Sequence, residues 1–314
     1  MYVVALDIGR AKAIAAILNE KGVVLVRENL PSVIAGHEIR LDVCVQAIKR
    51  LMCKMALKAE DFVGLGVSLP GIVDYEAGVL IHMPYANYEN IAVTEFLAAN
   101  LGIANIQCEN DVNACAIAEQ RFGLGRTYTD FVWMAVDAGV SGAVVEGSKL
   151  VHGGQGFAGE IGHLKVEYKT PAHCPCGQFG CLEVHGSGTA LVREIRKRRL
   201  ESQAFADTLE EMGLKPDEAG CAALAKAGNP DALEIMDRMG TYLGRGISYC
   251  INILNTQAIV IGGSVSAFLE LLLPSIRISI QQNALKRMQD INIVKNPLGI
   301  EASLLGAAAL ILEN

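Results

Sequence analysis

The stretch Tyr2-Val3-Val4-Ala5-Leu6-Asp7-Ile8-Gly9 decides how the chain begins to fold. Its apolar run predicts a short buried strand, and Asp7-Ile8-Gly9 predicts a sharp turn at the strand's end. A second strand over 13–18 follows at once, and a third over 23–27 comes after the turn Asn19-Glu20-Lys21-Gly22, where glycine tolerates positive φ. The chain therefore begins as a three-stranded meander.

The same pattern returns 130 positions later, where a strand over 131–136 ends in Asp137-Ala138-Gly139 and a further strand covers 143–145. We interpret the two Asp-x-Gly hairpins as an internal duplication of an α/β unit, although a chance recurrence of so short a pattern is the open alternative. Periodicity predicts the remaining elements. These are helices over 37–59, 93–100, 111–122, 304–312 and much of 189–254, and strands over 62–68, 105–108 and 258–261.

Length and composition predict two packed domains. A chain of 314 residues is too long for one ordinary core, and 51% hydrophobic residues are enough to fill two. We expect a smaller domain over 1–119 that takes back the last helix, about 298–314, and a larger domain over 120–297 that carries the cysteine-rich turn described next. No long linker occurs, so the two domains should meet across a cleft.

Charge and the first residues exclude other classes of protein. The net charge is -7, and the basic run Arg196-Lys197-Arg198-Arg199 falls within a helical pattern, where we interpret it as a solvated face. We therefore expect no nucleic acid as partner. The apolar stretch 1–8 is too short for a signal peptide or a membrane span, which predicts a cytoplasmic protein without a membrane partner.

His163, Cys174, Cys176 and Cys181 form the pattern His-x10-Cys-x-Cys-x4-Cys. Three thiols and one imidazole complete a closed tetrahedral shell, which is typical of structural zinc. Glycine and proline between the cysteines allow the tight turns that wrap thiolates around one ion. A cysteine-rich surface turn without metal is the alternative, and we expect the neighbouring His173 to stay outside the shell.

Six segments, in chain order, resemble the ROK family of repressors, open reading frames and sugar kinases. They are Asp7-Ile8-Gly9, Leu69-Pro70-Gly71, Glu109-Asn110-Asp111-Val112-Asn113-Ala114, Gly159-Glu160-Ile161-Gly162-His163, Cys174-x-Cys176-Gly177-x-x-Gly180-Cys181-Leu182-Glu183 and Ile261-Gly262-Gly263. The cysteine turn with the preceding Gly-Glu-Ile-Gly-His is the most specific of them. The resemblance implies a two-domain α/β fold of the actin-like ATPase (ribonuclease H-like) class with an interdomain cleft.

The resemblance also implies an activity, that of a hexose kinase similar to glucokinases, fructokinases or allose kinases. Family repressors carry an N-terminal DNA-binding helical domain, whereas this chain starts on its first strand, so we expect the kinase branch. The family often forms dimers through the larger domain, which makes a homodimer the expected assembly.

Asp111 is the candidate general base. It follows a predicted strand and opens a predicted helix, where a cleft residue would point outward; a helix-capping role is the alternative. The resemblance carries the base of phosphoryl transfer onto Asp111. It carries sugar binding onto Asn110, Glu160, His163 and Glu183, together with Pro70 and Gly71, and His163 would serve both zinc and sugar.

The expected nucleotide site departs from the family. Family kinases follow the first Asp-x-Gly with Gly-Thr and a lysine, whereas this chain has Arg10-Ala11-Lys12. Their second hairpin reads Gly-Thr-Gly, whereas here Asp137-Ala138-Gly139 brings a carboxylate, which repels phosphates unless Mg²⁺ lies between them. We still expect ATP with Mg²⁺ as co-substrate, bound at Asp7, Gly9, Arg10, Lys12, Asp137, Gly139, Gly262 and Gly263.

Three hypotheses follow. The first is ATP-dependent phosphorylation of a hexose or hexose derivative, with a small-molecule sugar and a nucleotide as partners. The second is a sugar-binding or sensing protein of the same fold that has lost most catalysis, as the altered phosphate hairpins would allow. A DNA-binding regulator is disfavoured. Residues 83–87 and 155–157 are expected to shape the choice of sugar.

Overall fold

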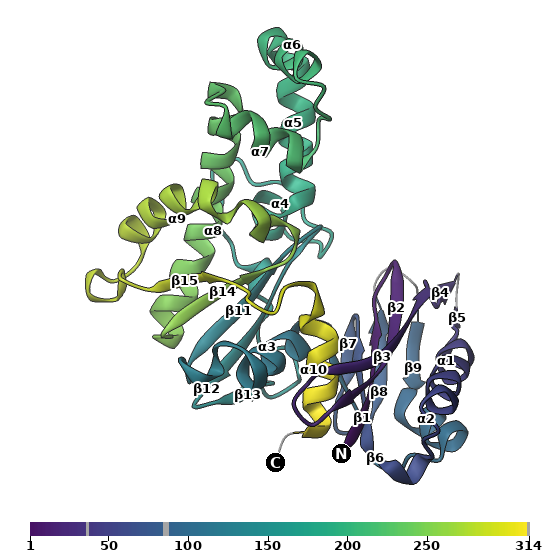
Figure 1. Cartoon of the computed structure of the whole chain (residues 1–314). Coiled ribbons are helices and arrows are strands. Elements are labelled where there is room, and N and C mark those ends of the chain that lie inside the picture. The colour runs from purple at the N-terminus through teal and green to yellow at the C-terminus, as the bar shows by residue number, and fades with distance from the viewer. Residues whose placement is uncertain (36–37, 84–87, 313–314) are drawn as a thin grey trace. The chain divides into compact units, whose positions relative to one another are not determined.

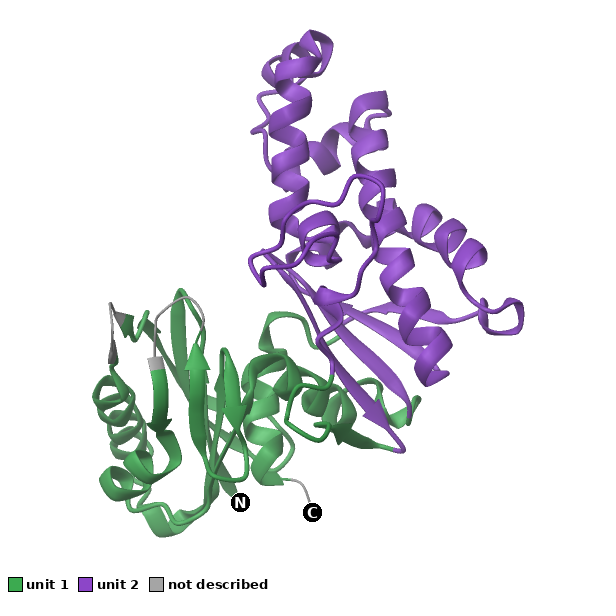
Figure 2. Cartoon of the chain, turned by 180° about the vertical axis from the view of Figure 1, so that it is seen from behind, with its two compact units in different colours: residues 1–129, 148–158, 297–314 green, residues 130–147, 159–296 purple. Residues whose placement is uncertain are grey.

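The computed structural model describes residues 1–35, 38–83 and 88–312, which form two compact units. Unit 1 comprises 1–129, 148–158 and 297–314, and unit 2 comprises 130–147 and 159–296 (Figure 2). Each unit is described by itself below.

The strands, most of which are labelled in Figure 1, are β1 (Tyr2–Ile8), β2 (Lys12–Asn19), β3 (Val24–Pro31), β4 (Ile34–Ala35), β5 (Glu38–Ile39), β6 (Phe62–Leu69), β7 (Ile72–Asp74), β8 (Val79–Met83), β9 (Tyr88–Ala92), β10 (Ile106–Asn110), β11 (Phe131–Val136), β12 (Val140–Glu146), β13 (Lys149–Val151), β14 (Ala258–Gly262) and β15 (Asn292–Lys295). The helices are α1 (Leu41–Lys54), α2 (Val93–Leu101), α3 (Asp111–Phe122), α4 (Glu183–Gly186), α5 (Gly188–Glu201), α6 (Gln203–Glu211), α7 (Glu218–Lys226), α8 (Pro230–Leu254), α9 (Leu269–Asn283) and α10 (Ala302–Leu312).

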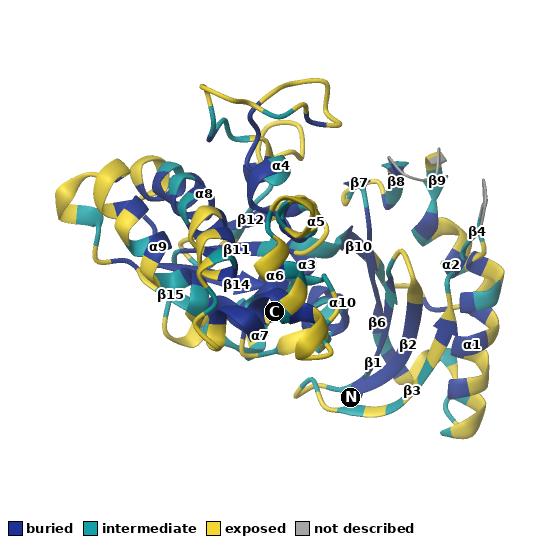
Figure 3. Cartoon of the chain, turned by 90° about the horizontal axis from the view of Figure 1, so that it is seen from above, coloured by how far each residue is buried: buried dark blue, intermediate teal, exposed yellow. Residues whose placement is uncertain are grey.

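Strand β1 is buried on both faces at the centre of the unit 1 sheet, whose order is β10-β6-β1-β2-β3. Successive side chains of a strand point to opposite faces. Val4 and Leu6 therefore join one apolar core, in which α1 and α2 pack, while Val3 and Ala5 join a second core with α10. Figure 3 shows β1, β2 and β6 largely in the colour of buried residues.

The sheet of unit 2 repeats this topology. Its order is β15-β14-β11-β12-β13. Strand β11 pairs antiparallel with β12 and parallel with β14, just as β1 pairs antiparallel with β2 and parallel with β6. The outer strands β15 and β10 extend the parallel part in the same way. The duplication predicted from the two Asp-x-Gly hairpins is thus present in the strand order.

The unit boundaries differ from the predicted ones. The first boundary lies after residue 129 rather than 119, because α3 runs unbroken to Phe122 and packs against α10 within unit 1. Residues 148–158, which the sequence assigned to the larger domain, group with unit 1. Helix α1 ends at Lys54 instead of 59, since Ala56 has positive φ; its predicted start at residue 37 lies outside the described residues.

Within the described residues, no helix combines the length and apolar character that crossing a bilayer requires.

Helix α10 packs closely on α3 because Gly306 lacks a side chain. A Cβ built on Gly306 would collide with the backbone carbonyl of Ala114 in α3. We predict that Gly306→Ala lowers the free energy of unfolding by about 1–3 kcal/mol, since backbone cannot yield as a flexible side chain can. Denaturant unfolding measures this difference.

The matched control is Gly154→Ala, because a Cβ at Gly154 meets no atom within 4 Å. Its free energy of unfolding should stay within about 0.5 kcal/mol of the parent. Unfolding curves that coincide for the two variants would contradict the close packing of α10 on α3.

Candidate functional site

Strand register brings three polar side chains into one row in unit 1. Asp7 of β1 lies opposite Ser68 of β6, and Ser68 lies opposite Glu109 of β10. The three strands run parallel, so the row lies near their carboxyl ends, where open α/β sheets bind ligands. Asp7 was predicted from the sequence as a site residue, whereas Ser68 and Glu109 were not, because register is a property of strand pairing.

Asp7 is held by serine hydroxyls. The Oγ of Ser303 donates to Asp7 Oδ1 at 2.7 Å, and the hydroxyls of Ser303 and Ser68 lie 2.6 Å apart. Burial raises the pKa of Asp7, while the hydrogen bonds from Ser303 and Ser68 and the charge of Lys12 oppose that rise. A half-buried carboxyl at a strand end, with a pKa shifted by its surroundings, is typical of functional sites.

The first hairpin is closed by backbone contacts. The N–H of Gly9 donates to the carbonyl of Lys12 at 2.9 Å, and the carbonyl of Arg10 accepts a hydrogen bond from Ser32 at 2.9 Å. Arg10 and Lys12 are both exposed. The hairpin therefore presents two cationic side chains next to the strand end that carries Asp7.

Asn110 joins the two predicted sugar-binding segments of unit 1. It is the N-cap of α3, and its Oδ1 accepts from the N–H groups of Val112 at 2.9 Å and Asn113 at 3.3 Å. Its Nδ2 donates to the carbonyl of Gly71 at 2.8 Å. Among the described residues the amide makes three hydrogen bonds, which leaves the second hydrogen of its NH₂ group for a ligand.

Asp111 begins α3 and is half-buried. Its Oδ1 accepts from Val112 N–H at 2.9 Å, but the capping position belongs to Asn110. Helix capping, the alternative raised by the sequence, is thus performed mainly by the preceding residue.

In unit 2, Glu183 contacts the second hairpin. Its Oε2 accepts from Val140 N–H at 3.2 Å, and a Cβ on Gly139 would collide with the same carboxylate. A Cβ on Gly162 would likewise collide with the carbonyl of Val140. The missing side chains of Gly139 and Gly162 let the predicted sugar-binding and phosphate-binding segments of this unit pack directly together.

The Asp137 carboxylate has a partner within the protein. Its Oδ1 accepts from Ser264 N–H at 2.7 Å, and Gly263, at φ +83°, would bring any Cβ against Val136 and Asp137. The backbone carbonyl of Asp137 also accepts from Gly188 N–H at 2.7 Å. Asp137 therefore anchors the turn at Gly262-Gly263, a role that the sequence did not indicate.

The four predicted metal ligands come together. The donor atoms of His163, Cys174, Cys176 and Cys181 all lie within 4.8 Å of one another. Cys174 Sγ is 3.8 Å from His163 Nδ1, and Cys176 Sγ is 3.7 Å from Cys181 Sγ. A tetrahedron with metal–sulfur bonds of about 2.3 Å has edges of about 3.8 Å, so the donor set fits one tetrahedral ion.

His163 connects this cluster to a predicted sugar ligand. With Nδ1 turned to the cluster, Nε2 lies 3.7 Å from Oε2 of Glu160. An imidazole bound to metal through Nδ1 carries its hydrogen on Nε2, which gives it a fixed donor. Among the described residues that could ligate, His173 is outside the cluster, and its ring packs edge-on against Phe179 at 5.1 Å.

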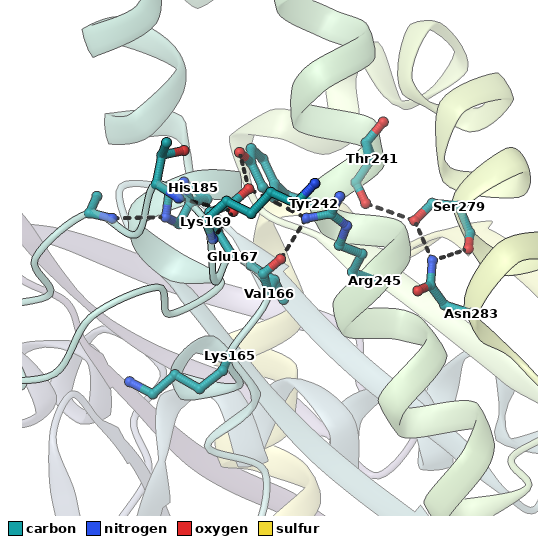
Figure 4. Close-up of polar contacts among 12 residues, drawn as sticks. Lys165, Val166, Glu167, Lys169, His185, Thr241, Tyr242, Arg245, Ser279 and Asn283 are labelled. Carbon is teal, nitrogen blue, oxygen red and sulfur yellow. Dashed lines mark hydrogen bonds and ion pairs between the residues drawn. The ribbon is translucent and has the colours of Figure 1, made fainter.

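A polar network holds the segment between His163 and the cysteines, and Figure 4 shows its residues Val166, Glu167, Tyr242 and Arg245. Arg245 of α8 donates to the carbonyl of Val166 at 2.7 Å and lies 3.6 Å from Glu167. Tyr242 donates to Glu167 at 3.1 Å. The pKa of Glu167 is lowered to about 2, chiefly because the Lys169 N–H donates a hydrogen bond to its carboxylate at 2.7 Å. These contacts fix the segment that follows His163.

A cavity of about 430 Å³ adjoins this network. None of the predicted sugar-binding, phosphate-binding or metal-binding residues lines it. The lining residues are Lys165, Val166, Glu167, Tyr168, Lys169, Arg245, Ser248, Tyr249, Asn252 and Asn283. Residues 84–87 of the predicted specificity segment 83–87 lie outside the described residues, and Gln155 to Phe157 are exposed.

Two sheets of the same strand order, each with polar residues at its strand ends, define the actin-like ATPase class of α/β protein that was predicted. The chain belongs to the ROK family, which matches residues 3–314. It is similar to a glucokinase of Thermotoga maritima, with 32% identity over 254 residues that cover 79% of each protein. It is also similar to the DNA-binding transcriptional dual regulator NagC of Escherichia coli, with 27% identity over 311 residues that cover 99% of this chain and 75% of the regulator.

A solved structure agrees with the fold. A ROK family glucokinase from Streptomyces griseus, in complex with glucose and AMPPNP, matches with a TM-score of 0.79 and 26% identity, covering 99% of both chains. Family membership is therefore shown, and relatives of similar identity include both sugar kinases and transcriptional regulators.

We predict that Asp7→Asn raises the melting temperature at pH 7 by a few degrees. The pKa of Asp7 is raised by folding, so between the unfolded pKa of about 3.8 and the folded pKa the native state binds more protons, and stability falls as pH rises. Asparagine removes that loss and can still accept from Ser303. Thermal unfolding at pH 7 and below pH 3.8 tests this, since the difference should vanish at the lower pH.

Asp42→Asn is the control of opposite sign. Asp42 is exposed, and hydrogen bonds from Arg40 lower its pKa, so its replacement should give no gain at pH 7. A melting temperature of Asp7→Asn that is unchanged or lower at neutral pH would show that the ionised carboxylate of Asp7 does not destabilise the fold.

Proposed function

We propose that this protein is a hexose kinase that transfers the γ-phosphoryl group of ATP to a hydroxyl of a hexose or hexose derivative. The observation that carries the proposal is the position of Asp111. It stands at the carboxyl end of a parallel strand, half-buried, with the helix cap supplied by Asn110. The relatives that are glucokinases support the same activity at family level.

In this reaction Asp111 acts as general base. Its carboxylate accepts the proton of the sugar hydroxyl while that oxygen bonds to the γ-phosphorus and the bond to ADP breaks. Phosphoryl transfer needs little other covalent help from the protein, so positioning and charge neutralisation supply most of the rate.

We propose that Glu160, His163 and Glu183 bind the hydroxyls of the same hexose. A sugar needs several fixed acceptors and donors. The contact of Glu183 with Val140 N–H and the proximity of Glu160 to His163 Nε2 support such a set, because each side chain is oriented by a neighbour. Asn110, with one amide hydrogen left, and the Pro70-Gly71 turn complete the proposed sugar ligands.

We propose that ATP·Mg²⁺ contacts both hairpins. Arg10 and Lys12 would neutralise phosphate oxygens, Gly9 and Gly139 would allow close approach of backbone, and Gly262-Gly263 would lie toward the adenosine. The Asp137 carboxylate accepts a hydrogen bond from Ser264 N–H but keeps its negative charge, so Mg²⁺ would have to lie between it and the phosphates.

A second candidate function is sugar sensing without efficient catalysis. It is favoured by the alanines at 11 and 138, which replace hydroxyl-bearing residues next to the expected phosphates, and by relatives that regulate transcription. Calorimetry with ATP·Mg²⁺ separates the two candidates, because tight nucleotide binding counts against a pure sensor.

We propose zinc as the ion of the Cys174, Cys176, Cys181 and His163 cluster, in a structural role. Three thiolates and an imidazole match zinc's preferred ligands and leave no open position for chemistry. When bound, zinc would hold the thiolates together and so brace the turn between His163 and Glu183.

We predict that Asp111→Asn lowers kcat by about 10²–10⁴-fold, the usual contribution of a general base, while the sugar Kd from calorimetry changes less than about threefold, because the amide keeps the shape of the side chain. A coupled ADP-release assay on a panel of hexoses measures kcat. Asp207→Asn, at an exposed acid hydrogen-bonded to Gln203, is the control and should match the parent.

Full activity of Asp111→Asn would remove Asp111 from the mechanism. A parent that binds a hexose but phosphorylates none would support the sensor instead.

We also predict that the purified protein carries one zinc ion per chain and that Cys181→Ser binds zinc on the order of a hundredfold more weakly, since one of four ligands is lost. Elemental analysis and competition with a chromogenic chelator measure both. Cys53→Ser, at an exposed cysteine outside the cluster, should retain the metal. Equal zinc content in the two variants would contradict the proposed ligand set.

A further inference from the structure

Glu109 is a buried carboxyl with three partners in unit 1. The side chain is 4% exposed. Its Oε1 accepts from Asn110 N–H at 2.8 Å and from Asn113 Nδ2 at 3.0 Å, and its Oε2 lies 2.6 Å from His152 Nε2. Two of these partners belong to the corner between β10 and α3, where Asp111 stands.

His152 is the third partner and comes from a distant segment. Its ring stacks on Tyr75 with centroids 3.7 Å apart and planes inclined by 16°. Its side chain is 22% exposed, so Tyr75 covers a face of the imidazole. Below, Glu109, Asn113, His152 and Tyr75 are called the Glu109 cluster.

The segment that carries His152 runs along α3. Gln120 donates to the carbonyl of Ser148, Ile117 lies in an apolar cluster against which Leu150 packs, and His152 bonds to Glu109 in β10, just before α3 begins. The step of three residues from Gln120 to Ile117 in α3 matches the step of two from Ser148 to Leu150, as expected for an extended chain lying on one face of a helix.

His152 also holds the chain that leads to Glu160. The carbonyl of His152 accepts from Ala158 N–H at 3.1 Å, which closes the loop between them. The chain then passes into unit 2 at Gly159, one residue before Glu160. The ring of His152 is thus bonded to Glu109, at the strand end before Asp111. The backbone carbonyl of His152 is bonded to Ala158, just before the segment that contains Glu160 and His163.

We propose that the Glu109 cluster is a positioning assembly for the reaction. The hydrogen bond between Glu109 and His152, whose ring stacks on Tyr75, holds in place both the backbone before Asp111 and the chain that leads to Glu160. This inference rests on the proposed function for its catalytic consequence, but not for its structural one. A misplacement of about 1 Å at a reacting group can cost about a hundredfold in rate, so a buried anchor two residues before the base is well placed to matter.

The test compares His152→Phe with His152→Gln. Phenylalanine keeps a ring on Tyr75 but cannot bond to Glu109, whereas the Nε2 of glutamine can take the place of the imidazole Nε2. His82→Phe is the matched control, since His82 and Glu89 are 4.0 Å apart in an exposed pair of the same unit.

Hydrogen exchange followed by mass spectrometry is the first measurement, and it needs no ligand. His152→Phe should exchange faster than the parent in two separate stretches, 109–113 and 158–163, while His152→Gln and His82→Phe should resemble the parent. Faster exchange confined to the surroundings of residue 152 would overturn the proposal.

Sugar calorimetry and kinase kinetics are the second measurement, made on the hexose that the parent uses. In His152→Phe, kcat should fall and sugar Kd should rise, each by about tenfold or more, with largely restored values in His152→Gln. Parent-like kcat and Kd in His152→Phe, with only a lower melting temperature, would mean a purely structural role and would also overturn the proposal. A parent that neither binds nor phosphorylates a hexose would refute the proposed function, and the exchange data would still decide the coupling.

Discussion

Burial of the central strand on both faces is the constraint on which unit 1 depends. Because β1 lies between two apolar cores, polar groups can appear only toward its ends. Asp7 stands at the carboxyl end, in register with Ser68 and Glu109 of the parallel neighbours. Unit 2 repeats the strand order and has Asp137 directly after β11. The candidate site residues Asp7 and Asp137 thus stand where the two sheets permit polar groups.

Each of these polar groups is held by a specific partner. Asp7 accepts from Ser303, Asn110 bonds to Gly71, and Asp137 accepts from Ser264. Such contacts lower the cost of keeping polar groups in a partly dry environment and orient them before any ligand arrives. Asp137 replaces the first glycine of the family's Gly-Thr-Gly hairpin, and the sequence suggested only repulsion of phosphates. In the structure its carboxylate also anchors the glycine turn at Gly262-Gly263.

The cysteine loop of unit 2 is likewise held by specific contacts. Its donor atoms lie at distances that suit one tetrahedral ion, and the network of Glu167, Tyr242 and Arg245 fixes the backbone beside it. Glu183, the first residue of α4 after the loop, contacts the second hairpin through Val140. The loop, the second hairpin and the candidate sugar ligand Glu183 are therefore packed together within unit 2, although they are distributed over more than forty positions of the chain.

The sequence by itself determined the features that depend on neighbours along the chain. These are the buried strands, the helix that begins at Asp111, the repeated hairpin, and the close spacing of three cysteines, which limits how far apart they can lie. Tertiary structure alone decided the contacts of Asp7 with Ser303 and of Glu109 with His152, which join residues 296 and 43 positions apart. It also decided that residues 148–158 group with unit 1, because helix packing and strand register act between segments that carry no local signal of each other.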